Sequence, residues 1–166
     1  MPSYYIHMNQ GIAADLRNFT LCSGQFASCA PIVFYNANDH TGGLYHLAGC
    51  SELKKIRVDH LRMIETVVGP TIIYVLSGTA DAVFGIAQGH VEPVKALFTK
   101  KDVRTDFNGR SSYSSISVSE KGGALTIEVG CDAAAIKLNT SKSIKAISAD
   151  VAFIGEERDE KLAKWL

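Results

Sequence analysis

Apolar and polar residues alternate along several short stretches of the chain, and this period of two is typical of half-buried β-strands. The clearest case is the pair of stretches 113–119 and 124–129, which flank the turn sequence Glu120-Lys121-Gly122-Gly123 and predict a β-hairpin. Short apolar runs rich in branched and aromatic residues predict further strands at 4–8, 32–35, 44–47, 71–76, 80–86, 133–138 and 144–147.

A helical period of three to four residues begins at Ser51, which is a suitable N-cap. One face of this helix is expected to carry Leu53, Ile56, His60, Ile64 and Val67. Gly69-Pro70 should end it. A second helix is expected over 91–98, where Pro93 is tolerated because it lies in the first turn. A charged amphipathic segment predicts a third helix over 156–166.

An α+β fold accommodates this order of strands and helices. The 166 residues are enough for a single domain, 1–166, with its own hydrophobic core. The sequence contains no repeat, low-complexity tract or linker. Its pattern does not indicate an oligomeric state.

The charge balance argues against several classes of function. Lys and Arg number 17, as do Asp and Glu, and no basic run exceeds two residues, so a nucleic-acid-binding surface is not expected. The sequence has no apolar stretch of transmembrane length and no secretory signal peptide, so membrane insertion is not expected. The four cysteines form no C-x-x-C pair, which favours a reduced, cytoplasmic protein.

Cys29 and His46 are the strongest candidates for chemistry. Cys29 follows a Gly/Ser-rich approach and precedes an apolar strand, while His46 lies on the next strand after the short polar turn 37–41. If the two strands pair as a hairpin, the thiol and the imidazole can approach each other. A cysteine with a histidine in hydrogen-bonding reach is the minimum unit of a cysteine nucleophile and its base.

Other interpretations of these residues remain open. Cys29 can instead be a buried structural thiol and His46 a surface histidine. Cys50 and His60 offer a second pair, although His60 lies about 15 Å along the helix axis from its start. A zinc site has candidate ligands in Cys22, Cys29, His40, His46 and Cys50. These candidates lack the short paired spacings of structural zinc sites, so neither a metal nor a cofactor is expected.

Three segments occur in an order that matches a known family. Ser28-Cys29 precede an apolar strand that ends at Tyr35, and Gly42-Gly43 precede His46. Further matches follow at 84–95 and 106–110. In order and spacing, residues 15–130 resemble the chemoreceptor glutamine deamidase (CheD) family. The resemblance implies a layered α/β/β sandwich and a cysteine-dependent amidohydrolase that converts glutamine side chains of a partner protein to glutamate.

The chain departs from the family pattern at Phe26-Ala27 and at His46-Leu47-Ala48-Gly49. These departures affect the identity of the substrate more than the chemistry. The partner protein is expected to be a chemoreceptor or, because glutamine-deamidating bacterial toxins resemble the same arrangement, a host protein. An effector of that kind would be exported without a recognisable signal peptide. A catalytically silent binding module on the same fold remains the alternative, and a protease is less consistent with the sequence.

The chemistry assigns a role to each residue around the pair. Cys29 is expected to attack as a thiolate beside an imidazolium, and His46 to return the proton to the departing ammonia. Ser23, at the family's threonine position, is expected to orient the imidazole. Backbone N–H groups near Ser28 and Cys29 are expected to form the oxyanion hole. The substrate is expected to contact Gly24, Ala27, Tyr35 and Gly43.

Overall fold

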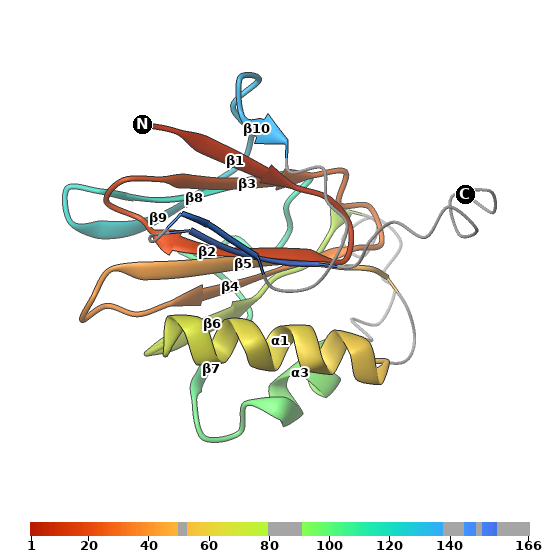
Figure 1. Ribbon diagram of the computed structural model, residues 1–166. Helices are drawn as coiled ribbons and strands as arrows, with labels where there is room; N and C mark the ends of the chain where they lie inside the picture. The colour runs from red at the N-terminus through yellow and green to blue at the C-terminus, as the bar shows by residue number, and fades with distance from the viewer. Residues whose placement is uncertain (50–52, 80–90, 138–144, 149–150, 156–166) are drawn as a thin grey trace.

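Two β-sheets and two helices make up the described part of the chain, which confirms the expected α+β class. The computed structural model describes residues 1–49, 53–79, 91–137, 145–148 and 151–155. Figure 1 shows the helices α1 (Lys55–Val68) and α3 (Val91–Leu97) against one face of the larger sheet, with the smaller sheet on its other face. The layers therefore follow the order helix, sheet, sheet.

The larger sheet has seven strands in the described residues. Their spatial order is β11 (Lys145–Ser148), β12 (Val151–Gly155), β2 (Gln10–Asp15), β5 (Thr41–Leu47), β4 (Ala30–Tyr35), β6 (Ile72–Val75) and β7 (Asp102–Arg104). The smaller sheet has the order β10 (Ile136–Lys137), β1 (Ser3–Ile6), β3 (Thr20–Gly24), β8 (Ser115–Lys121) and β9 (Ala124–Glu128).

The two predicted hairpins are both present. β8 and β9 pair antiparallel around Gly122 and Gly123, whose φ angles of 60° and 79° are favourable for glycine and strained for other residues. β4 and β5 also pair antiparallel, with Pro31 opposite His46. This second hairpin carries the candidate Cys/His pair at its open end.

Four strands were not expected from the sequence: β2, β3, β7 and β12. β2 lies in the middle of the larger sheet and is buried on both faces, so it shows no alternation of apolar and polar residues. The strand expected at 133–138 is reduced to Ile136–Lys137 among the described residues. The strand expected at 80–86 and the helix expected at 156–166 lie outside the described residues.

Helix α1 is confirmed, but it begins at Lys55 with Lys54 as its N-cap instead of at Ser51, and its buried face is rotated from the expected one. The buried residues are His60, Leu61, Ile64 and Val68, whereas Ile56 and Val67 are 42% and 45% exposed. Ile64 belongs to both faces, and the rotation places Val68 instead of Val67 against the sheet, where the helix approaches closely at two glycines. A Cβ on Gly11 would lie 2.5 Å from Ile64 Cδ1, and one on Gly43 would lie 2.7 Å from Ile64 Cγ2. Ile64 fills the space that these glycines leave.

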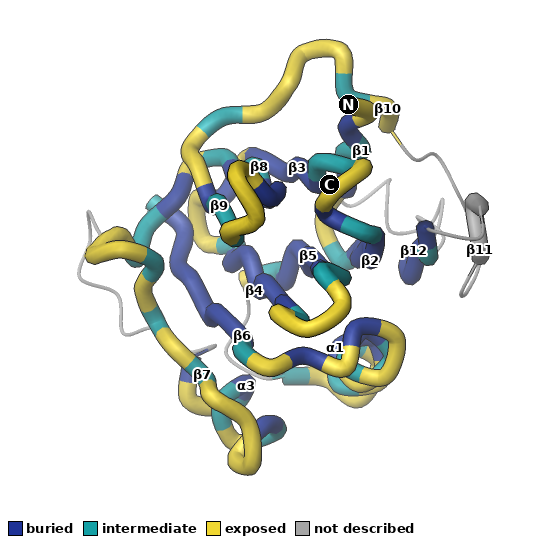
Figure 2. Tube along the Cα trace, turned by 90° about the vertical axis from the view of Figure 1, so that its left-hand side faces the viewer, coloured by how far each residue is buried: buried dark blue, intermediate teal, exposed yellow. Residues whose placement is uncertain are grey.

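The apolar residues form two clusters, one on each side of the larger sheet. One fills the space between the sheets and includes Leu16, Phe26, Leu44 and Val118. The other lies between the larger sheet and the helices. Figure 2 shows the buried strands in the middle of the molecule, with the exposed turns around them. Residues of β4 and β5 alternate between these clusters, which determines the direction that each side chain faces.

Candidate active site

Cys29 and His46 face the same side of the larger sheet. His46 lies opposite Pro31 in the β4–β5 ladder, and Cys29 comes two residues before Pro31. Because side chains alternate along a strand, Cys29, Pro31 and His46 all face the smaller sheet. Cys29 is partly buried and packs against the apolar cluster between the sheets. The expected pairing of the two strands is present, and its register makes Cys29 and His46 diagonal neighbours across the hairpin.

Ser23 joins His46 to the smaller sheet. Its Oγ lies 2.8 Å from His46 Nδ1 and donates a hydrogen bond of 2.7 Å to the carbonyl oxygen of Ile6. A serine hydroxyl has one proton, and here Ile6 accepts it. His46 therefore donates its Nδ1–H to Ser23 Oγ, which leaves Nε2 unprotonated. This hydrogen-bond arrangement fixes the tautomer that a general base requires.

The imidazole of His46 is buried and neutral. Only 3% of the residue is exposed, and the Phe26 ring lies against it with 4.2 Å between ring centroids. Burial, with a smaller contribution from the charge of His7, lowers the pKa of His46 from 6.5 to about 4. The expectation of a resting imidazolium beside the thiol is therefore wrong: desolvation outweighs any benefit from charge at this position.

His46 Nε2 is a buried nitrogen with no hydrogen-bond partner among the described residues. Leaving such an atom unpaired costs about 1–3 kcal/mol of folding free energy. Buried polar atoms are nearly always paired in native proteins, so this exception, on the sheet face that Cys29 also occupies, marks Nε2 as a candidate functional atom. A base that is ready to accept a proton has this arrangement.

The loop before Cys29 is held by backbone contacts from two other segments. The N–H of Phe26 donates to Ser114 O at 3.0 Å, and both the N–H and the hydroxyl of Thr79 donate to Phe26 O at 3.0 and 3.1 Å. Ala27 and Ser28 are exposed at the tip of this loop. The Ser28 N–H donates to no other described residue, which leaves it available to an oxyanion.

Two glycines outside the Cys/His motif allow this close packing, and the sequence analysis missed their role. A Cβ on Gly78 would clash with the carbonyl oxygens of Ala27 and Cys29, and one on Gly49 would clash with the Ser28 carbonyl. Ser77-Gly78 reads from the sequence as an ordinary turn. The sequence signal that could have pointed to Gly49 is its position immediately after His46-Leu47-Ala48.

Three of the four expected substrate contacts lie elsewhere. The Tyr35 hydroxyl is at the opposite end of β4 and donates a 2.6 Å hydrogen bond to Glu120 Oε2. Gly43 faces Ile64 and Val68 of α1, and Gly24 faces Tyr5 on the outer side of the smaller sheet. These positions correct the expectation. Ala27, exposed and two residues before Cys29, remains the candidate substrate contact.

The alternative Cys/His constellations are not assembled in the described residues. Cys50 lies outside them, and the Nδ1 of His60 is 2.8 Å from the Tyr45 hydroxyl. Of the proposed zinc ligands, His40 binds Glu120 at the far end of the hairpin, and Cys22 lies in β3, one residue before Ser23. The described ranges contain no group of three or more candidate metal ligands.

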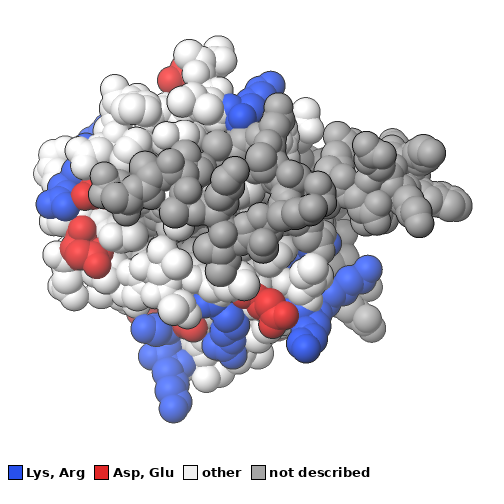
Figure 3. Space-filling model, viewed as in Figure 1, with Lys and Arg blue, Asp and Glu red and all other residues white. Residues whose placement is uncertain are grey.

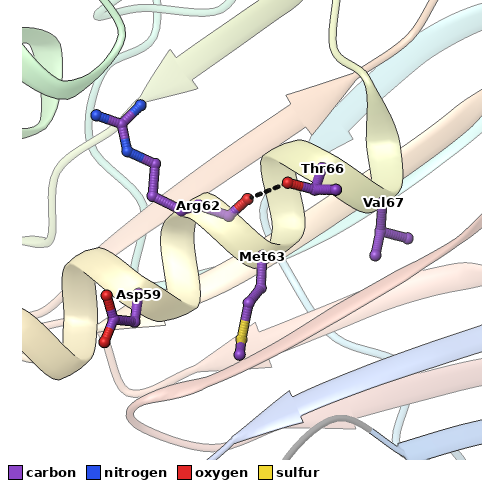
Figure 4. Close-up of a pocket in the computed structure, with 5 residues that line it drawn as sticks. All are labelled: Asp59, Arg62, Met63, Thr66 and Val67. Atoms are coloured by element: carbon purple, nitrogen blue, oxygen red, sulfur yellow. Dashed lines mark hydrogen bonds between the residues drawn. The ribbon is translucent and has the colours of Figure 1, made fainter.

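A surface groove runs along α1, on the other side of the larger sheet from His46. Asp59, Arg62, Met63, Thr66 and Val67 line it (Figure 4). The Thr66 hydroxyl donates 2.9 Å to the carbonyl of Arg62 within the same helix. The groove shares no residue with the Cys29 loop, and it is therefore a separate surface.

No protein-family model and no curated protein matches the chain. Among the described helices, none is both long enough and apolar enough to span a membrane. Arguments about function therefore depend on the geometry of the site and on the resemblance of its motifs.

Proposed function

We propose that the chain is a cysteine-dependent amidohydrolase that deamidates glutamine side chains of a partner protein. The observation that carries this proposal is the hydrogen bond from His46 Nδ1–H to Ser23 Oγ, which leaves a buried, unpaired Nε2 on the face that Cys29 also occupies. The motif resemblance to the chemoreceptor glutamine deamidase family, with its layered α/β/β fold, supports the choice of an amide substrate.

The first half of the reaction uses His46 as a base. Nε2 accepts the thiol proton of Cys29 as the sulfur attacks the side-chain amide carbon of glutamine. The carbonyl oxygen gains negative charge and receives hydrogen bonds from the backbone N–H groups of Ser28 and Cys29. The imidazolium then gives its proton to the amide nitrogen, the C–N bond breaks, and ammonia leaves a thioester on Cys29.

The second half repeats the proton transfer with water. His46 Nε2 takes a proton from a water molecule that attacks the thioester, and the C–S bond breaks to give glutamate and the free thiol. Ser23 contacts no reacting atom. It is a positioning residue, which holds the imidazole in one tautomer and stabilises its transient positive charge through the Nδ1–H bond.

The partner is proposed to be a protein with an exposed glutamine, either a chemoreceptor or a host protein, and the proposed location is the cytoplasm unless the chain is an exported effector. Nucleic acid is a poor candidate. On the face drawn in Figure 3, Lys and Arg side chains are interspersed with Asp and Glu where residues are described. A continuous basic surface is the feature that phosphate backbones require.

The test is conversion of glutamine to glutamate in candidate partners. Lysates of the source organism and of candidate hosts are incubated with the protein or with its Cys29→Ser variant, and peptides are compared by mass spectrometry. Glutamine sites converted only by the unmodified protein support the proposal. Their absence from every lysate, together with no ammonia release from glutamine-containing peptides, contradicts it.

A catalytically silent binding module is the second candidate. One observation favours it: His46 Nε2 is shielded from solvent in this structure, so a substrate reaches the base only through Cys29 or after a rearrangement. The same variant separates the two candidates. Cys29→Ser removes thioester chemistry and leaves the surface nearly unchanged, so retention of every cellular effect identifies a binder.

A further inference from the structure

Two cysteines that the proposed chemistry does not use lie next to each other on the outer face of the smaller sheet. In β3, Leu21 and Ser23 face the interior, so Cys22 faces outward. Cys22 Sγ lies 3.5 Å from Ser117 Oγ on the neighbouring strand β8. Cys131, in the segment after β9, packs over the same strands: its Sγ is 2.9 Å from Ser23 O and 3.5 Å from Ile116 O.

The register of the strands places the two sulfur atoms together. Cys22 pairs with Ser117, and Ser23 pairs with Ile116, so the contacts of the two sulfurs lie on adjacent rungs of one ladder. Cys131 Sγ contacts the carbonyl of Ser23, the residue that follows Cys22, so the two thiols are neighbours on the same face of the sheet. Neighbouring thiols on one face are the starting point for a disulfide.

The two thiols differ in access to solvent. Cys131 is exposed, whereas Cys22 is fully buried. The neighbouring Cys131, the Ser117 hydroxyl and the Asp132 backbone lower the pKa of Cys22, whereas Cys22 and burial raise the pKa of Cys131. An exposed thiol beside a buried thiol is the arrangement of an entry cysteine and a resolving cysteine.

We propose that Cys22 and Cys131 form an oxidisable dithiol that a low-molecular-weight disulfide, such as oxidised glutathione, converts to a Cys22–Cys131 disulfide. In the first step Cys131 sulfur attacks oxidised glutathione, its S–H proton passes to the departing glutathione thiolate, and a mixed disulfide forms on Cys131. In the second step Cys22 sulfur attacks the Cys131 sulfur and a second glutathione leaves, protonated by the Cys22 proton. Both cysteines are oxidised, and one oxidised glutathione becomes two reduced molecules.

The disulfide would connect β3 to the segment that leads into β10. It would also remove the S–H that Cys131 donates to the carbonyl of Ser23, the residue that orients His46. The dithiol proposal does not depend on the amidohydrolase, because disulfide formation is measured without a substrate.

The experiment uses the full chain with Cys29→Ser and Cys50→Ser, so that only Cys22 and Cys131 carry thiols. The protein is treated with oxidised glutathione, and the unreduced digest is analysed by mass spectrometry. The expected product is a cross-linked peptide pair containing Cys22 and Cys131, with loss of two hydrogen atoms from the intact mass and no retained glutathione. Alkylation of both thiols to the same extent before and after treatment would overturn the proposal.

A matched variant tests the order of the two steps. Adding Cys22→Ala to this background removes the resolving thiol, so Cys131 should keep one glutathione in a stable mixed disulfide. Cys131→Ser should remain unmodified, because buried Cys22 does not reach the reagent. If the background protein retains glutathione on Cys131 as fully as its Cys22→Ala variant, the two thiols do not act as a pair. If the Cys22→Ala variant does not fold, the Cys22–Cys131 cross-link in the Cys29→Ser, Cys50→Ser protein still tests the proposal.

Discussion

Protonation of His46 should make the protein less stable in mild acid, and His46→Asn should remove most of this effect. Asparagine carries an amide N–H close to the position of Nδ1, so it retains a donor for Ser23 Oγ while losing the titratable ring. The folded protein resists protonation of His46 because its pKa falls from 6.5 to about 4. The unfolded chain has no such resistance, so it binds more protons between these values.

The sign and magnitude follow from this difference in proton binding. Stability rises with pH wherever the unfolded state binds more protons, so the contribution of His46 is complete above pH 6.5 and is lost as the pH falls toward 4. Each pH unit in this window changes the free energy of unfolding by about 1.4 kcal/mol. At pH 4.5 the loss relative to pH 7.5 is about 2.5 kcal/mol, allowing for partial protonation of folded His46.

The measurement is urea denaturation of the unmodified protein and of His46→Asn at several pH values from 7.5 to 4.5. Other carboxylates and histidines titrate in both proteins, so the difference between the two pH profiles isolates His46. His7→Asn removes an exposed histidine and should change the pH profile far less than His46→Asn, because the charge of His7 makes only the smaller contribution to the pKa of His46. If the profiles of the unmodified protein and His46→Asn differ by less than about 0.5 kcal/mol over this range, His46 is not buried in its neutral form.

Iodoacetamide near neutral pH should label Cys29 ahead of the other three cysteines, and earlier labelling of Cys50 would favour the alternative pair of Cys50 and His60. Ser23→Ala should lower kcat while Ser23→Thr retains activity, whereas an unchanged kcat in Ser23→Ala would show that His46 needs no hydroxyl partner. Cys29→Ala and His46→Asn together should reduce ammonia release little more than either alone, because partners in one proton transfer are strongly non-additive; additive losses would contradict a shared step. Gly78→Ala should lower the free energy of unfolding by about 1–3 kcal/mol through the clash with the Cys29 loop, and an unchanged urea midpoint would show that the loop yields freely.

The sequence predicted those elements whose pattern is local. The β8–β9 hairpin follows from alternation around Gly122-Gly123, and α1 follows from its helical period. β2 escaped prediction because both of its faces are buried, which removes the polar half of the alternation. The rotated face of α1 could not be predicted from the helix sequence, since it depends on glycines in two strands beneath the helix.

The candidate site was predictable only in part, for a related reason. Cys29 and His46 lie on consecutive strands, so hairpin pairing alone predicts that they approach. Ser23 meets His46 across two different sheets, and only the motif resemblance suggested it. Tyr35 was misplaced because a motif position says nothing of strand length: six residues of extended chain from Cys29 span about 20 Å. The neutral state of His46 depends on burial, which the sequence does not reveal.

The β4–β5 hairpin is connected to the smaller sheet by polar contacts at both of its ends. At the open end His46 binds Ser23, and at the turn Tyr35 and His40 both bind Glu120, at 2.6 and 2.7 Å. Directional hydrogen bonds at two separated points add to the apolar packing between the sheets and oppose both sliding and rotation. Breaking the Glu120 side-chain contacts should therefore weaken one of these two points, so a substitution far from Cys29 would alter the alignment of the reacting groups.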